Sequence, residues 1–149
     1  MKTVDMKTIN KLKQVQADAM IMHIKLHNLH WNVKGMAFYQ IHQMTEGMYT
    51  SMATLFDDVA ERILQLGQKP LVTMAQAVEF GHIEETEKTE FDSKEVLEII
   101  KTDYIHFLYE FKELSNFAAE LNDTTTIAFA DENIAKLEKD IWMLKASLA

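Results

Sequence analysis

The sequence predicts an all-α fold of four long helices, with one short extra helix between the second and the third. Apolar residues recur at intervals of three and four through four long stretches, which is the pattern of helices that bury one face. Stop signals end these stretches, such as Gly67 and Pro70 after the second one. The length of 149 residues suits a single domain, residues 1–149, with enough apolar content to bury a core.

The first two helices are expected on either side of a short break. The first is expected to begin between residues 5 and 8 and to run to about Asn32. The second is expected to run from beyond Gly35 to about Leu66. Their inward faces are expected to carry Ile9, Leu12, Val15, Ala19, Met22, Leu26 and Leu29 in the first helix and Ile41, Met44, Met48, Leu55, Val59 and Ile63 in the second.

A long connection, residues 71–90, follows the second helix. Connections of this length usually contain structure of their own, so Met74–Phe80 is expected to form the short helix. The connection also spells Glu-x-x-His at Glu79 and His82, a pattern of di-iron bundles. We interpret it as a coincidence, because Gly81 interrupts it and no second copy occurs on another helix.

The remaining two helices have recognisable ends. Asp92 or Ser93 is expected to cap the third, with Glu95 completing a capping box. The last is expected after a turn at residues 122–126 and to run to about Leu148. Their buried faces are expected to carry Leu97, Ile100, Tyr104, Phe107, Leu108, Phe111, Leu114, Ala118 and Leu121 in the third helix and Ile127, Ile134, Leu137, Ile141, Trp142 and Leu144 in the last.

One face of the second helix carries side chains that bind metals. At about 100° per residue, His42, Glu46 and Asp57 lie within about 60° of one another, and Glu61 lies about 40° further round. Asp57 comes fifteen residues after His42, however, which is about 22 Å along a helix. First-row metals accept ligands at only about 2.0–2.3 Å, so one straight helix cannot bring both ends of the stripe to one ion.

A second copy of the same helix removes this difficulty. In an antiparallel pair related by a two-fold axis, residues whose numbers add to the same total face each other. His42 with Glu61, and Glu46 with Asp57, give equal totals, so two equivalent sites would form. The crossing point would fall between residues 51 and 52, where small side chains allow two backbones to approach closely.

A further imidazole, His30, lies near the end of the first helix. It is expected to lie beside His42 once the two helices fold back on each other. Imidazole with carboxylate suits Fe(II), Mn or Zn. The alternative interpretation of these residues is a solvated polar helix face, since His and Glu are common there. Asp103, His106 and Glu110 form a competing cluster on the third helix, which we interpret as solvated charge because lysines are interspersed.

The motif His-Trp-Asn-Val-x-Gly-x-x-Phe-x-x-x-His, followed by Asp-x-x-Ala-Glu-Arg, resembles the signature of Dps proteins, the mini-ferritins of starved bacterial cells. The matching residues are His30, Trp31, Asn32, Val33, Gly35, Phe38, His42, Asp57, Ala60, Glu61 and Arg62. The resemblance covers essentially the whole chain, including residues 65–70 and 141–146. Residues 27–31 and 111–116 also resemble the neutrophil-activating branch of that family.

The resemblance implies a ferritin-like bundle, twelve copies of which enclose a hollow shell. It implies that Fe(II) is oxidised at inter-subunit ferroxidase sites, preferably with hydrogen peroxide, and that the ferric mineral is stored inside, protecting against oxidative stress. The family's ferroxidase ligands match His30, His42, Asp57 and Glu61. Glu46, the remaining expected metal ligand, stands where the family more often has Asp.

Several neighbours of the expected ligands have more than one interpretation. Trp31, Tyr39 and Tyr49 are expected to pack in the core, and the alternative is that they donate electrons to stray oxidising equivalents. His27 is expected either to assist a ligand or shuttle protons, or to be a partly buried, hydrogen-bonded imidazole. His23 is expected at the surface.

Iron also needs an entrance to the shell. Asp123, Asp131 and Glu132 cluster at the start of the last helix, where a three-fold pore would need acidic lining. Acidic residues are favoured at helix N-termini for other reasons, which is the alternative.

Two other function classes remain as alternatives. Many Dps proteins compact DNA through a lysine-rich tail, but this chain has only Lys2, Lys7, Lys11 and Lys13 near its start. Its formal net charge of −8 at pH 7 opposes generic attraction to phosphate, so DNA binding is not indicated. An extracellular, immune-stimulating role like that of the neutrophil-activating branch is a further alternative that no residue tests.

The sequence excludes several kinds of site and location. There are no cysteines, which excludes disulfides and thiolate ligands. No apolar run reaches the length of a signal peptide core or of a membrane span, so a cytoplasmic location is expected.

Overall fold

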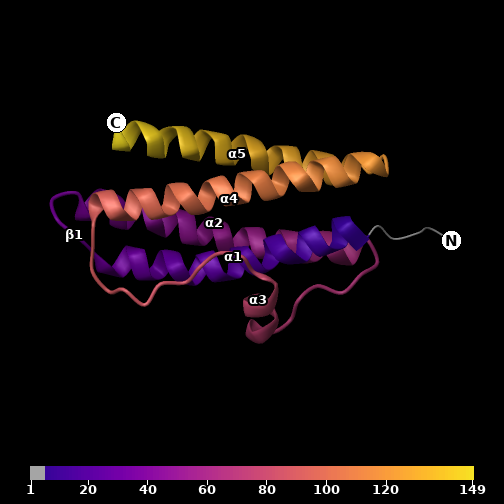
Figure 1. The fold of residues 1–149 in the computed structure, drawn as a ribbon, viewed down its shortest axis with the longest axis horizontal. Coiled ribbons are helices and arrows are strands. Elements are labelled where there is room, and N and C mark those ends of the chain that lie inside the picture. The colour runs from indigo at the N-terminus through magenta and orange to yellow at the C-terminus, as the bar shows by residue number, and fades with distance from the viewer. Residues whose placement is uncertain (1–5) are drawn as a thin grey trace.

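A computed structural model describes residues 6–149 of the chain, and its elements confirm the all-α prediction. In order they are α1 (Met6–Asn32), β1 (Val33–Lys34), α2 (Phe38–Gln65), α3 (Met74–Phe80), β2 (Phe91–Asp92), α4 (Ser93–Glu120) and α5 (Thr124–Leu148). The long helices α1, α2, α4 and α5 lie side by side as a bundle, and the short α3 lies outside it (Figure 1). Among the described residues, no helix is both long and apolar enough to cross a membrane, and the cytoplasmic location stays a prediction.

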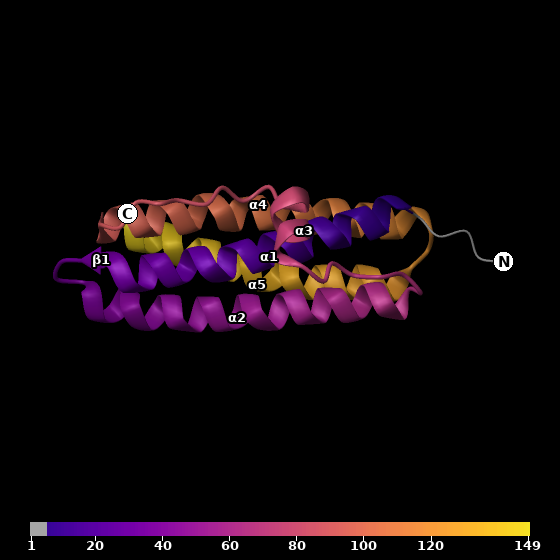
Figure 2. The ribbon, with the colours of Figure 1, turned by 90° about the horizontal axis from the view of Figure 1, so that it is seen from below.

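The connection between α2 and α4 follows the length of the bundle, because α2 and α4 both begin at the same end (Figures 1 and 2). Along this path α3 packs against α1. Near its end, Asn28 of α1 donates hydrogen bonds to the carbonyl oxygens of Thr86 and Lys88, at 3.2 and 3.0 Å. The strand β2 then pairs in parallel with β1, with Val33 opposite Phe91. Sequence reasoning missed these strands because two residues show no periodicity.

The starts of α3 and α4 agree with the sequence signals, whereas α5 begins at Thr124, inside the stretch that was expected to be a turn. Asp92 caps α4 and forms the predicted capping box with Glu95. Thr73 and Gln76 form a second capping box at α3. Asp123 caps α5 by accepting a hydrogen bond from the backbone N–H of Thr126 at 3.1 Å.

The core lies between the long helices, and its largest fully buried side chains include Leu12, Met22, Leu26, Ile63, Ile100, Tyr104, Phe107 and Phe111. All seven residues predicted to face inward on α1 are buried. Two predictions for the later helices are wrong in the single chain. Leu121 is 51% exposed because it lies beyond the end of α4, and Trp142 is 66% exposed because it follows buried Ile141 about 100° further round the helix.

Ionic side chains are buried between α1 and α4. Asp18 is 0% exposed, and its Oδ2 lies 2.9 Å from Nε2 of His106. Lys25 pairs with Asp103 at 2.7 Å, and Lys11 pairs with Glu110 at 2.6 Å. The interpretation of Asp103, His106 and Glu110 as solvated charge is therefore wrong. Sequence periodicity placed these residues on one face but could not show that α1 supplies buried partners of opposite charge.

Asp18 also holds the connection against the bundle. Its Oδ1 accepts hydrogen bonds from the backbone N–H groups of His82 and Ile83, at 2.5 and 2.9 Å. The hydrogen bond to Asp18 raises the pKa of His106, against the opposing effect of burial. A buried carboxylate of this kind is stable only with such partners, because an unpaired buried charge is strongly destabilising.

The raised pKa of His106 predicts a pH-dependent contribution to stability. Its charged neighbours are Asp18 from α1 and Asp103 and Glu110 from α4, and His82 faces it from the connection. A raised folded-state pKa stabilises the fold fully below the ordinary value of about 6.5, and this stabilisation is lost as the pH rises through the folded value. With EDTA present, His106→Asn should therefore lower the thermal unfolding midpoint more at pH 6 than at pH 8.5. Equal losses at the two pH values would contradict the assignment.

Candidate metal centre

The end of α1 and the start of α2 place two imidazoles against each other. The rings of His30 and His42 are stacked, with centroids 3.6 Å apart and planes 13° from parallel. The turn between the helices contains Gly35, whose φ of 120° is a backbone conformation that L side chains rarely adopt. The predicted proximity of His30 and His42 is confirmed, whereas their role as metal ligands stays a prediction.

Reciprocal hydrogen bonds fix the orientation of both rings. Nδ1 of His30 lies 2.7 Å from the carbonyl oxygen of His42, and Nδ1 of His42 lies 2.9 Å from the carbonyl oxygen of His30. A carbonyl oxygen only accepts, so each Nδ1 carries the proton in the neutral ring. The lone pair of each ring is then on Nε2, which is the arrangement of a metal-binding histidine oriented by its other nitrogen.

Thr45 adds a third hydrogen bond to this arrangement. Its hydroxyl donates to the carbonyl oxygen of Ile41 at 2.7 Å, which leaves its oxygen free to accept from Nδ1 of His30 at 3.0 Å. Thr45 is fully buried and His30 is 5% exposed. Burial lowers the pKa of His30, so the ring stays neutral and able to donate its lone pair at neutral pH.

Aromatic rings surround the pair on the α1 side. Tyr49 is stacked on His27, with centroids 3.7 Å apart, and meets His30 edge-on at 5.2 Å. Nδ1 of His27 donates to the carbonyl oxygen of His23 at 2.7 Å. His27 is thus partly buried and hydrogen-bonded, as one of its two interpretations from the sequence expects. His23 is itself half-buried, and its Nδ1 donates to the carbonyl oxygen of Tyr49 at 2.7 Å. The expectation that His23 lies at the surface is therefore wrong.

The other two aromatic residues are not in the core of the single chain. Trp31 is 66% exposed and Tyr39 is 72% exposed, so the core-packing prediction is wrong for both. Tyr49 does pack against the core as predicted. The sequence pattern failed for Trp31 and Tyr39 because they lie beside the turn between α1 and α2, where no neighbouring helix covers them.

The carboxylates of α2 are exposed, and those of Asp57 and Glu61 are separated from the imidazoles. Glu46 lies one turn after His42. Asp57 and Glu61 lie near the other end of α2, where oxygens of Asp57, Asp58 and Glu61 are within 4.8 Å of one another. Residues 6–149 contain two groups of three or more such donor side chains, and neither includes His30 or His42. A protomer by itself therefore does not unite the two halves of the predicted site.

Sequence reasoning missed Asp58, although its position next to Asp57 was an available signal. Arg62, the neighbouring cation, makes its hydrogen bonds with Gln65 and with residues near the start of α5. Its Nε donates to Oγ1 of Thr126 at 3.0 Å, and its Nη2 pairs with Asp123 at 3.3 Å. Among residues 6–149, Arg62 therefore forms its ion pair with Asp123 and not with this acidic group.

The residues proposed to line a pore differ in their surroundings. Asp123 caps α5 and pairs with Arg62, and hydrogen bonds from Thr126 and Arg62 hold its pKa below the ordinary value although burial opposes this. Asp131 and Glu132 are exposed on α5. The pore assignment stays a prediction.

Comparisons with known proteins agree with this architecture. The model of the ferritin-like domain family matches residues 9–149, so the chain is a ferritin-like protein. A protein of Helicobacter pylori called DNA protection during starvation protein is 50% identical over 144 residues, which cover 97% of this chain and 100% of that relative. The chain therefore belongs to the Dps family.

Solved structures of relatives have the same fold. The crystal structure of Helicobacter cinaedi CAIP superimposes with a TM-score of 0.94 at 47% identity, covering 95% of this chain and 99% of that one. A Dps protein from Vibrio cholerae, described as a member of a broad superfamily of ferritin-like diiron-carboxylate proteins, superimposes with a TM-score of 0.92 at 26% identity, covering 97% and 90%. The predicted ferritin-like bundle is confirmed by these comparisons, and the dodecamer stays a prediction.

The hydroxyl of Thr45 should contribute to metal affinity. Thr45→Val keeps the volume but removes one of the two acceptors for Nδ1 of His30, and the carbonyl oxygen of His42 remains. We expect the affinity for Zn²⁺, measured by titration calorimetry, to fall by about tenfold, the lower end of the roughly 10–100-fold that outer-shell partners of ligating histidines contribute. Thr50→Val, at an exposed position of the same helix, is the control and should bind Zn²⁺ like the native chain. Equal affinities of the two variants would contradict the role of Thr45.

Proposed function

We propose that this protein oxidises Fe(II), preferably with hydrogen peroxide, at inter-subunit sites and stores the ferric mineral in a dodecameric shell, protecting the cell against oxidative stress. The observation that carries the proposal is the stacked pair of His30 and His42, whose Nδ1 atoms are both occupied by backbone carbonyls. Two oriented Nε2 lone pairs at a helix turn suit metal binding better than packing alone, which needs no such orientation.

The separation of the ligands supports a site shared between two protomers. Asp57 and Glu61 lie about 22–29 Å along α2 from His42, far beyond the reach of one ion. The carboxylates of Glu46, Asp57 and Glu61 are all exposed in the single chain and so are accessible to a partner. Antiparallel pairing of α2 with a second copy would place His30, His42 and Glu46 of one protomer opposite Asp57 and Glu61 of the other.

The residues near the crossing point are compatible with that pairing. Gly47, Ser51, Ala53 and Thr54 have small side chains, and a Cβ added at Gly47 meets no atom within 4 Å in the single chain. Two α2 helices can therefore approach closely along this face.

Glu46 is one methylene longer than the Asp that is more common in the family, so it would reach the ion from a slightly greater distance.

The donor set suits iron as the substrate. Imidazole nitrogen with carboxylate oxygen is the ligand combination of non-haem Fe(II) sites, and the Vibrio cholerae relative is described as diiron-carboxylate. Two Fe(II) ions, one hydrogen peroxide molecule and two protons give two Fe(III) ions and two water molecules. Transfer of both electrons in one encounter avoids release of a hydroxyl radical. The protein's part is to position the ions and to balance their charge.

The name of the Helicobacter pylori relative refers to protection of DNA, which could also come from coating the DNA. The contacts of the lysines near the start of the chain support that mechanism less well. Of the four lysines near the start of the chain, Lys2 lies outside the described residues. Lys7 lies 3.9 Å from Glu120, and Lys11 pairs with Glu110 and Glu113. The ammonium of Lys13 lies over the ring of Phe80. With these contacts and a net charge of −8, we propose that protection comes from the removal of Fe(II) and peroxide.

The role of Asp57 can be tested directly. Asp57→Ala should lower the rate of peroxide-driven Fe(II) oxidation by at least about tenfold, because even outer-shell changes cost about 10–100-fold. Helix content and particle mass should stay unchanged, since Asp57 is exposed. Glu87→Ala removes the same charge from the exposed connection and serves as the control. Oxidation kinetics in Asp57→Ala that match this control would refute the proposed site.

Sharing of the site between protomers predicts complementation. His42→Ala and Asp57→Ala chains, each inactive alone, should regain about one quarter of the native oxidation rate when refolded together in equal amounts, because half of random dimers are mixed and each holds one complete site of two. A mixture of His30→Ala and His42→Ala chains should regain nothing, because both changes fall on the same half of the site. Absence of recovery in the first mixture, with dimers formed, would exclude an inter-subunit centre.

A further inference from the structure

We propose a second site for a divalent transition-metal ion of the Zn²⁺ or Fe²⁺ type, formed by His82, His106 and Glu110. Asp18, which lies outside this group of three but contacts His106, is available as a further donor. The site lies between α1, α4 and the connection that follows α3, whereas the ferroxidase residues lie on α2 and the end of α1. The inference is independent of the proposed function.

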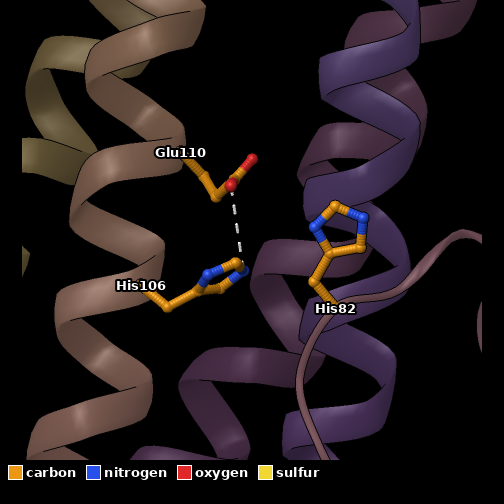
Figure 3. A group of neighbouring side chains, drawn as sticks. All are labelled: His82, His106 and Glu110. Atoms are coloured by element: carbon orange, nitrogen blue, oxygen red, sulfur yellow. Dashed lines mark ion pairs between the residues drawn. The ribbon is translucent and has the colours of Figure 1, made fainter.

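Three separate segments bring these donors together. His106 and Glu110 lie one turn apart on α4, and His82 lies opposite them on the connection, beside α1 (Figure 3). One donor atom from each of the three residues lies within 4.8 Å of the other two. Two imidazoles and one carboxylate form the ligand combination of many Zn²⁺ and non-haem Fe²⁺ sites.

The distances around His106 are close to those that a metal requires. Ligand atoms at about 2.0–2.1 Å from a tetrahedral ion lie about 3.3–3.4 Å apart. Nε2 of His106 lies 3.9 Å from Oε1 of Glu110 and 2.9 Å from Oδ2 of Asp18. These two separations bracket the required value. The donor atom of His82 lies within 4.8 Å of those of His106 and Glu110, so binding of an ion would draw His82 inward by up to about 1.5 Å.

The two carboxylates are held with one oxygen each toward His106. Lys11 occupies Oε2 of Glu110 at 2.6 Å, which leaves Oε1 on the side of His106. Backbone N–H groups occupy Oδ1 of Asp18, which leaves Oδ2 for His106. In the absence of metal, Oδ2 and Nε2 share a proton, and the incoming ion would take its place and release it.

His82 can adopt the tautomer that a metal needs, with the proton on Nδ1 and the lone pair on Nε2. Its Nδ1 lies 2.7 Å from Nε2 of Gln14, whose Oε1 accepts from Lys11 at 3.1 Å. A half-turn of the Gln14 amide would present its oxygen to a proton on Nδ1 and so free Nε2 of His82 for the ion. The same half-turn removes the hydrogen bond from Lys11 to Gln14, because the amide nitrogen cannot accept, while Lys11 keeps its ion pairs with Glu110 and Glu113.

Ions have a route to this position from solvent. His82 and His106 line an open cleft of about 530 Å³ beside α4, together with Glu84, Glu98 and Asp103. Among the described residues that line the cleft, the one lysine is Lys25, and it forms an ion pair with Asp103. Glu98 is paired with Lys101, so the excess negative charge of the lining comes from the exposed Glu84, which attracts cations. The exposed side chain of His82 can move to admit one.

Zinc binding tests the proposal in a chain whose ferroxidase site has been weakened. In an Asp57→Ala background, the number of Zn²⁺ ions bound per subunit is measured by equilibrium dialysis with and without His82→Ala. We expect His82→Ala to remove about one Zn²⁺ per subunit, because a structural site needs about four ligands. His82 is exposed, so its loss should leave the fold intact. Glu84→Ala, which removes another side chain of the same cleft, is the control and should keep the ion.

Further readouts separate this site from the ferroxidase centre. Crystals grown with Zn²⁺ should show an anomalous scattering peak between His106 and Glu110, and this peak should disappear in His82→Ala. In the otherwise native chain, His82→Ala should leave the rate of Fe(II) oxidation unchanged. Equal Zn²⁺ binding with and without His82 would overturn the proposal and leave the cluster as a metal-free hydrogen-bond network. The ferroxidase proposal would be unaffected by that result.

Discussion

The packing of α1 against α2 is the interaction on which the candidate metal centre depends. Each imidazole is oriented by a backbone carbonyl of the opposite helix, so the geometry of the pair is fixed by the relative position of two backbones. A shift of α2 along α1 by a fraction of a turn would break both hydrogen bonds. The short turn that joins the helices contains Gly35 at positive φ, and it limits how far α2 can shift along α1.

The two sides of α1 are built from different chemistry. Toward α2 it presents His23, His27 and His30, whose rings all contact the ring of Tyr49. Toward α4 it presents Asp18 and two lysines in buried ion pairs. Buried ion pairs add little net stability against an apolar alternative, yet removal of one partner is costly. Net stability therefore does not explain the ion pairs on the α4 side, whereas the proposed second metal site gives these groups a role beyond packing.

Large apolar side chains on the outside of the protomer accord with assembly into a larger particle. Met36 is fully exposed, and Trp31, Tyr39 and Trp142 are each more than half exposed. Residues of this kind are usually covered in interfaces when they occur together. They fit the proposal that α2 and its neighbouring turn meet other copies of the chain, since Met36 and Tyr39 flank the start of α2.

The sequence alone determined the helices, their ends and the family. Periodicity and capping are local properties, so the limits of α3 and the capping box of Asp92 were predictable from a few neighbouring residues. The motif from His30 to Arg62 identified the family, and helix geometry showed that one chain cannot complete the expected centre.

The tertiary structure decided which side chains meet across elements. The stacking of His30 on His42, the burial of Asp18 beside His106 and the approach of His82 to α4 join residues from 12 to 88 positions apart. Such contacts depend on how helices pack and where a connection lies, and no local pattern encodes them. For the same reason Asp103, His106 and Glu110 looked solvated in sequence, although the fold buries them against lysines and an aspartate of α1.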